Sequence, residues 1–159
     1  GQSVVIADTF AKAGLKVPLL SQTSYEKLST FFNIIGGSYR NPFDISSTFL
    51  MANNGISNLA NMLDVMDHDY NIDSVVLELF PLVRPMGQDS ETPETVLDAI
   101  SDFKDRSNKP FMVIANAAPS ETLGQELRDK LMEKGIPSYP NFERGAKALK
   151  KLVEYYRLK

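Results

Sequence analysis

The sequence contains no cysteine and only one histidine among its 159 residues. The lack of cysteine excludes disulfides, thiolate metal sites and a cysteine nucleophile. It fits a reducing compartment, and we expect a cytoplasmic protein. The histidine, His68, lies in a polar stretch that we interpret as a surface loop. Because one histidine cannot build a histidine-rich metal centre, we expect no metal site on this chain.

Long apolar runs and an excess of positive charge are also missing. The longest apolar run, residues 75–83, contains Glu78 and Pro81 and is far shorter than the roughly 20 residues that span a bilayer. The 17 basic and 20 acidic residues leave a net charge of −3. Phosphate backbones are bound by clustered lysines and arginines, and here the basic residues cluster only at Lys147, Lys150 and Lys151. We therefore expect neither nucleic acid nor a membrane as a partner.

The composition suits one soluble domain spanning residues 1–159, with 43% hydrophobic and 23% charged residues. Strand and helix patterns alternate along the chain, which predicts an α/β fold with a mostly parallel sheet. Short apolar runs predict buried strands at 74–80 and 111–115, and a short strand is predicted at 138–139. A further strand at 16–20 is weakened by Pro18, which cannot donate a ladder hydrogen bond.

Apolar residues at helical spacing predict five helices. They cover residues 23–32, 56–66, 93–106 after a Thr92 cap, 120–134 before Gly135, and a last helix after Asn141. The start of the chain has two interpretations. The β-branched run in residues 3–7 favours a strand by local propensity. The alternative is a helix that opens at Gln2 or Ser3 and ends at Gly14.

Several short motifs follow one another in a recognisable order. They are Gly1, the segment 5–8 ending in Asp8, Gly14-Leu15, Asn41-Pro42-Phe43-Asp44, the acidic loop 69–73, the strand 75–80, Lys109-Pro110 and Gly135-Ile136-Pro137. In this order and spacing they resemble the C-terminal flavodoxin-like (CoA-ligase) domain of the NDP-forming acyl-CoA synthetases. That family includes the ADP-forming acetate–CoA ligases and, more distantly, the succinyl-CoA synthetases. The resemblance covers nearly the whole chain.

The resemblance implies a flavodoxin-like three-layer sandwich in which residues 4–13 are helical. The first strand of such a domain lies upstream of Gly1, so this chain would be a fragment of a longer polypeptide that lacks that strand. We then expect an exposed apolar sheet edge, or pairing of that edge with another chain.

The resemblance also implies an activity for the parent enzyme. Such enzymes convert acyl-CoA, ADP and phosphate into the acid, ATP and CoA through an acyl phosphate and a phosphohistidine. The parent would use CoA, ADP or ATP, and Mg, with CoA-binding and ATP-grasp domains that are fused or separate. Because His68 matches no motif position, we expect this chain to shape the phosphoryl-transfer site without being catalytic alone. The alternative is a non-catalytic flavodoxin-like binding or regulatory module.

Two helix starts are candidates to face a phosphoryl group, because free N–H groups and the helix dipole attract anions there. The first comprises Gly1, Gln2 and Ser3, with no carboxylate before Asp8. The second comprises Met86 and Gly87. Acidic residues crowd the second start, at Asp89, Glu91 and Glu94, and they stabilise the helix itself while repelling a phosphate.

Two further polar features have alternative interpretations. Asn41, Pro42 and Asp44 either fix a tight loop through bonds to the backbone or contact substrate. In either case we expect the loop near the carboxyl ends of the strands. Glu78 interrupts an apolar strand, and a buried carboxylate needs a partner or a proton. Its interpretations are an ion pair with Arg84 or Arg40, or an acid–base role.

Overall fold

The structure is a computed structural model that describes residues 2–32, 38, 40–44, 54–80, 94–116 and 120–158. Helices and strands alternate through most of this part of the chain. Their order is α1 (Gln2–Lys12), α2 (Gln22–Ser29), α3 (Gly55–His68), β1 (Val75–Leu79), α4 (Glu94–Arg106), β2 (Phe111–Ala115), α5 (Glu121–Glu133), β3 (Ser138–Tyr139) and α6 (Phe142–Arg157).

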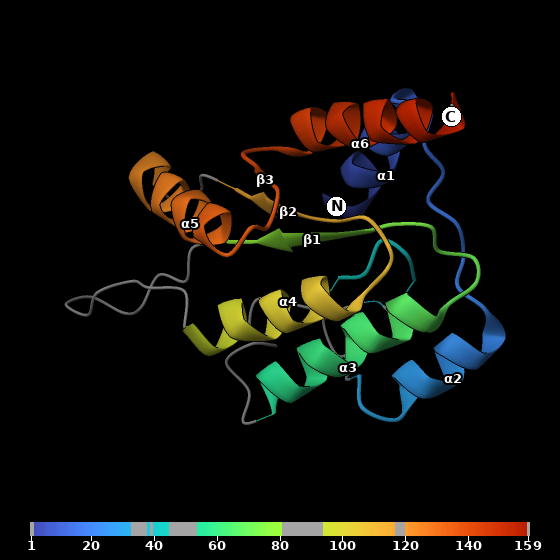
Figure 1. Ribbon diagram of the computed structural model, residues 1–159. Helices are drawn as coiled ribbons and strands as arrows, with labels where there is room; N and C mark the ends of the chain where they lie inside the picture. Colours follow the sequence, from blue (N-terminus) through green and yellow to red (C-terminus); the bar gives the residue numbers. More distant parts are fainter. Residues whose placement is uncertain are drawn as a thin grey trace.

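The three strands form one parallel sheet in the order β1-β2-β3. Helices α1 and α6 cover one face of this sheet, and α3 and α4 cover the other, with α2 extending the second layer (Figure 1). Such layers are expected when parallel strands are joined by helices, since both faces of the sheet must then be covered. The predicted α/β, flavodoxin-like three-layer fold is confirmed.

The core divides into two clusters because side chains alternate across the strands. Phe111, Val113 and Ala115 of β2 face the larger cluster beneath α3 and α4. Met112 faces a smaller cluster with Phe10 of α1 and residues of α6. All five residues of β2 are buried, as a strand covered on both faces requires. The central strand therefore anchors both helical layers.

The sequence left a strand and a helix open at the start of the chain, and the structure has the helix α1 there. Residues 2–12 are helical, so the interpretation as a strand is wrong and the one implied by the resemblance is confirmed. Ile6 and Phe10 lie four residues apart and join the cluster with α6, where Phe10 packs edge-to-face on Phe142. Packing of this apolar stripe outweighs the strand propensity of the β-branched residues. Gly14, at φ +77°, ends the helical region.

The other helices begin and end close to the predicted positions. Ser120 and Asn141 cap α5 and α6 by accepting the backbone N–H of Leu123 and Arg144. Gly135 adopts φ +67° after α5, in the left-handed region that glycine tolerates. Thr92 and Pro93, the predicted start of α4, lie outside the described residues.

The predicted strand at 16–20 is wrong, since this segment joins no sheet in the structure. Its backbone carbonyl groups accept hydrogen bonds from side chains of neighbouring loops. The carbonyl of Pro18 accepts from the Asn41 amide at 2.9 Å, and that of Leu19 accepts from the Asn71 amide at 3.2 Å. Pro18 itself has no N–H for a ladder. The segment therefore forms an anchored link between α1 and α2.

β1 is an edge strand among the described residues. The N–H of Val75 bonds to Pro110, and the carbonyl of Leu79 accepts from Asn116, so these alternate residues face β2. In a parallel ladder the backbone groups of the intervening residues, Val76 and Glu78, then face the outer edge. The middle of β1 is only half-buried. This agrees with the expected exposed sheet edge.

A buried carboxylate joins α2 to the loop before β1. Asp69 is 1% exposed, and its two oxygens accept the backbone N–H groups of Ser21 and Asn71, each at 2.8 Å. Burial raises the pKa of Asp69, but hydrogen bonds from Ser24, Ser21 and Asn71 outweigh it and hold the pKa below the usual value. The carboxylate thus replaces water as the acceptor for two backbone groups.

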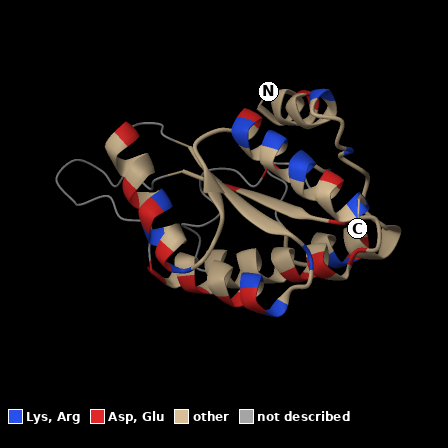
Figure 2. Cartoon of the chain, turned by 45° about the horizontal axis from the view of Figure 1, so that its top comes forward, with Lys and Arg blue, Asp and Glu red and all other residues tan. Residues whose placement is uncertain are grey.

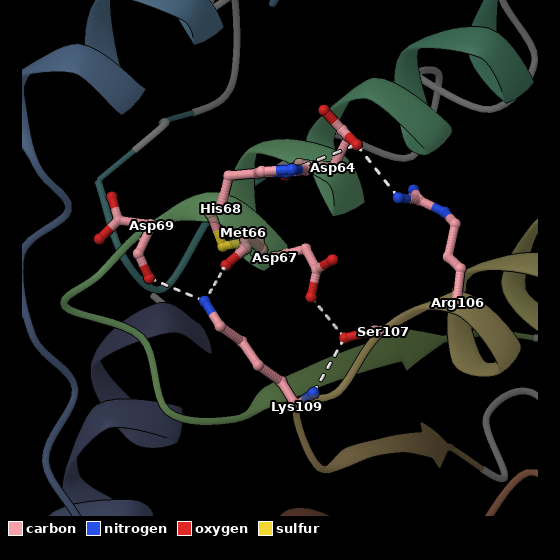
Figure 3. A network of polar contacts seen from close by, with 8 residues as sticks. All are labelled: Asp64, Met66, Asp67, His68, Asp69, Arg106, Ser107 and Lys109. Carbon is pink, nitrogen blue, oxygen red and sulfur yellow. Dashed lines mark hydrogen bonds and ion pairs between the residues drawn. The ribbon is translucent and has the colours of Figure 1, made fainter.

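A second set of polar contacts joins the end of α3 to the start of β2 (Figure 3). The ammonium group of Lys109 donates to the carbonyls of Met66 and Asp69, at 2.8 and 2.7 Å. The carbonyls at a helix end lack helical partners and carry partial negative charge, which a lysine can satisfy. His68 is the exposed last residue of α3, where its ring contacts Asp64, so the loop predicted for it is wrong.

We predict that Asp69→Asn destabilises the fold by about 2 kcal/mol at neutral pH, because an amide N–H₂ then faces a backbone N–H. The folded pKa of Asp69 lies below its unfolded value of about 3.9, so the stabilisation exists above that value and is lost as pH falls towards the folded pKa. Urea unfolding from neutral to acidic pH measures this. The control Asp73→Asn, on an exposed residue of the same loop, should change little. A pH-independent gap between wild type and Asp69→Asn would contradict the mechanism.

Candidate functional site

A cluster of polar side chains lies at the carboxyl end of the sheet. Glu78 is the fourth of the five residues of β1, and Asn116 directly follows β2. The Gln2 amide, at the start of α1, donates to both oxygens of Glu78 at 2.8 and 3.0 Å. The Asn116 amide donates to one of the same oxygens at 3.4 Å. Three elements therefore meet at one carboxylate, at the end of the sheet where α/β folds bind ligands.

The start of α1 contributes backbone groups to this cluster. The chain begins close above the sheet (Figure 1), and the contact between Gln2 and Glu78 puts the helix start at the carboxyl end of β1. The first turn of α1 contains no acidic residue, and Ser3 in that turn is half-buried. Helix N–H groups without helical partners attract anions. Gln2 and Ser3, predicted to face a phosphoryl group, thus lie beside Glu78, whereas Gly1 falls outside the described residues.

The environment of Glu78 favours its protonated form. Burial raises the pKa of this carboxyl group, and the hydrogen bonds from Asn116 and Gln2 only partly offset that effect. Among the described residues its hydrogen-bond partners are the neutral amides of Gln2 and Asn116, and no ion pair with Arg40 forms; an ion pair with Arg84 stays a prediction. Arg40 is exposed, with its backbone N–H bonded to Ser38, and Arg84 lies outside the described residues. A half-buried acid whose contacts within the described part of the chain are neutral amides is suited to holding a proton or accepting a donor.

Sequence reasoning missed two residues of this region. Asn116 could have been found, because it is the first polar residue after the buried strand 111–115. Arg128 of α5 had no such signal. Its guanidinium group is buried and donates to the Ala115 carbonyl at 3.1 Å, to Gln125 at 2.8 Å and to Glu121 at 3.3 Å. A helical arginine normally faces solvent, so only the folded structure reveals this contact.

The Asn41 loop lies elsewhere in the fold. The Asn41 amide bonds to Pro18, beside Leu19 and Ser21, which are held by the loop that precedes β1. This places it at the amino end of the sheet, so the expected location near the carboxyl ends is wrong. Asp44 and Ser38 exchange two backbone hydrogen bonds, at 2.8 and 2.9 Å, and the Asn41–Pro42 peptide is cis. These contacts fix the loop itself, and a contact with substrate stays a prediction.

The other predictions concern Met86 and Gly87, metal sites and membrane-spanning segments. Met86 and Gly87 lie outside the described residues. In the described part of the chain, no three His, Cys, Asp or Glu side chains gather as metal ligands would. Within the same part, no helix has the length and apolarity to cross a membrane. Charges of both signs are interspersed over the helices (Figure 2), and Glu78 is the only charged residue of the three strands.

Comparison with known proteins gives matches in structure only. No family model matches the chain, and no curated protein matches it in sequence. The structure of PH0766 from Pyrococcus horikoshii OT3 matches with a TM-score of 0.73 and 23% identity, over 97% of this chain and 33% of that one. The dinucleotide forming acetyl-coenzyme A synthetase 1 of Ca. Korarchaeum cryptofilum matches at 0.67 and 22%, over 98% and 31%. Its complex with phosphate and ADP matches equally well.

At these identities the likeness establishes the fold. It extends over nearly the whole chain. The chain spans about one third of the length of the solved proteins that it matches.

We predict that Glu78→Gln is at least as stable as the wild type near neutral pH. A carboxyl with a raised folded pKa binds more protons in the folded state, so stability falls as pH rises from the unfolded pKa, about 4.3, to the raised folded pKa. The variant lacks this loss, so its advantage over the wild type should grow as pH rises from about 4 through the raised folded pKa. Urea unfolding measures it, with the exposed Glu126→Gln as control. A large loss of stability at neutral pH would identify Glu78 as a structural carboxylate.

Proposed function

We propose that this chain is a domain of an NDP-forming acyl-CoA synthetase and that Gln2, Ser3 and Glu78 help to shape its phosphoryl-transfer site. The observation that carries this proposal is that an acid-free helix start meets a half-buried carboxyl group with a raised pKa at the carboxyl end of the sheet. The likeness to a dinucleotide forming acetyl-coenzyme A synthetase over 98% of the chain supports this assignment.

The chemistry of the site is compatible with a travelling phosphoryl group. The N–H groups at the start of α1 can stabilise phosphoryl oxygens by hydrogen bonds and by the helix dipole. An ionised Glu78 would repel such an anion, but burial already favours its protonated form. The approach of negative charge favours protonation further, and a protonated carboxyl can donate a hydrogen bond to a phosphoryl oxygen.

The remaining parts of the reaction belong to other domains in this proposal. The only histidine of the chain, His68, lies at the end of α3 and contacts Asp64, at the opposite end of the sheet from Glu78. The phosphohistidine would therefore come from elsewhere in the enzyme, as would the CoA-binding and ATP-grasp domains with CoA, ADP or ATP, and Mg. A cytoplasmic location follows from these substrates.

The second candidate is a non-catalytic binding or regulatory module of the same fold. One observation favours it, since the contacts of Glu78 with described residues come from the neutral amides of Gln2 and Asn116, and none of them comes from a cation that would neutralise phosphate. In this alternative the cluster at the carboxyl end of the sheet would hold a ligand or partner without phosphoryl transfer.

The test uses the polypeptide that carries this chain in its source cells, isolated with an antibody to the domain. We expect formation of acyl-CoA from a short carboxylic acid, CoA and ATP, and an acid-labile, base-stable phosphoryl label on the protein. Glu78→Gln should lower the rate roughly a hundredfold or more while the fold stays intact. Glu126→Gln, on the exposed face of α5, is the matched control.

Two results would contradict the proposal. Wild-type activity in Glu78→Gln would remove Glu78 from the site. The absence of both the label and acyl-CoA formation, across a panel of acids with ATP or GTP, would favour the binding module.

A further inference from the structure

We propose that Asn116 and Arg128 are positioning residues, with Arg128 fixing the peptide group from which Asn116 reaches the carboxyl of Glu78. The role in catalysis rests on the proposed function, whereas the arrangement itself can be tested without it. Neither residue was identified from the sequence. Asn116 directly follows β2, and Arg128 lies in α5.

One peptide group at the end of β2 is held by two different elements. The carbonyl of Ala115 and the N–H of Asn116 belong to the same rigid plane. The carbonyl accepts from the guanidinium of Arg128 at 3.1 Å, and the N–H donates to the carbonyl of Leu79 at 3.1 Å. This plane is therefore held on both sides, by α5 and by β1, just where β2 ends.

The side chain of Asn116 extends from this peptide plane to Glu78. The Asn116 amide donates to Glu78 Oε1 at 3.4 Å, and the Gln2 amide donates to the same oxygen at 2.8 Å. The 3.4 Å contact is long, so a small rotation of the peptide plane would break it. Together the two amides restrict the rotation of the carboxyl group and aim it towards the start of α1.

Arg128 is a buried arginine, and its burial needs a physical reason. Burying a guanidinium group is unfavourable unless its N–H groups find acceptors. Leu127 and Leu131 already anchor α5 in the core, so attachment of the helix does not require a charge. The planar fork of Arg128 reaches the Ala115 carbonyl and Gln125 together, which a lysine could not reproduce. Its contact with the end of β2 is thus specific for that carbonyl.

The test measures the pKa of Glu78 by NMR of its side-chain carboxyl carbon in the 159-residue chain. The Asn116 hydrogen bond lowers this pKa, so Asn116→Ala should raise it further. Arg128→Lys should raise it in the same direction and speed the hydrogen exchange of the Asn116 side-chain amide. Gln22→Ala is the matched control, since it removes another Gln–Glu contact, to Glu26 at 3.2 Å on the exposed side of α2.

A merely structural role gives a different result. If Arg128→Lys lowers the midpoint of urea unfolding but leaves the Glu78 pKa and the Asn116 exchange at wild-type values, the proposal is overturned. An unchanged Glu78 pKa in Asn116→Ala overturns it as well. Should Arg128→Lys not fold, Arg128→Gln keeps one donor for the Ala115 carbonyl and is measured in the same way.

The activity readout separates this proposal from the proposed function. In the active native polypeptide, Asn116→Ala should lower kcat about tenfold with little change in the KM for nucleotide, because positioning acts on the transition state. A shifted Glu78 pKa in a protein without synthetase activity would support the positioning role and contradict the proposed function. A lowered kcat with an unshifted Glu78 pKa would support the proposed function and contradict the positioning role.

Discussion

The buried carboxylate of Asp69 ties the start of α2 to the turn before β1 by hydrogen bonds, beside the apolar core that these segments share. It accepts the N–H that opens α2 and the N–H of the turn before β1, from a position almost closed to water. A charge so placed is tolerated because hydrogen bonds replace its hydration, and these bonds outweigh the effect of burial and lower the pKa of Asp69. Nearby, the amides of Asn41 and Asn71 bond to carbonyls of the link 15–20, and Lys109 bonds to the backbone carbonyl of Asp69 after α3.

The two ends of the sheet use polar groups in opposite ways. At the amino end, Asp69 and Lys109 are paired with backbone atoms, and their contacts stabilise the fold. At the carboxyl end, burial raises the pKa of Glu78, so ionising this group at neutral pH works against stability. A charged group that weakens the fold is typical of a site where function is carried out. This difference between the two ends of the sheet explains why Asp69 and Glu78, two acids of similar chemistry, have different proposed roles.

The motifs that resemble acyl-CoA synthetases fall on both ends of the sheet. Asn41, Asp69 and Lys109 bond to the backbone and help to determine the fold. The start of α1 and the strand with Glu78 meet at the other end. The resemblance therefore owes much to residues that any protein of this shape could use for folding. Because one fold serves many functions, the argument for phosphoryl transfer rests on Gln2, Ser3 and Glu78.

The sequence by itself determined most of the helices, their caps and the two long strands, because apolar periodicity and capping residues act locally, as at Ser120, Gly135 and Asn141. It also marked Glu78 as unusual, since a charge in an apolar strand is visible without a structure. Only the tertiary structure decided that 16–20 stay outside the sheet and that amides from Gln2 and Asn116 contact Glu78, and it settled between a strand and a helix for residues 2–12. These outcomes depend on packing and hydrogen bonds between residues far apart in the chain, which local propensity does not contain.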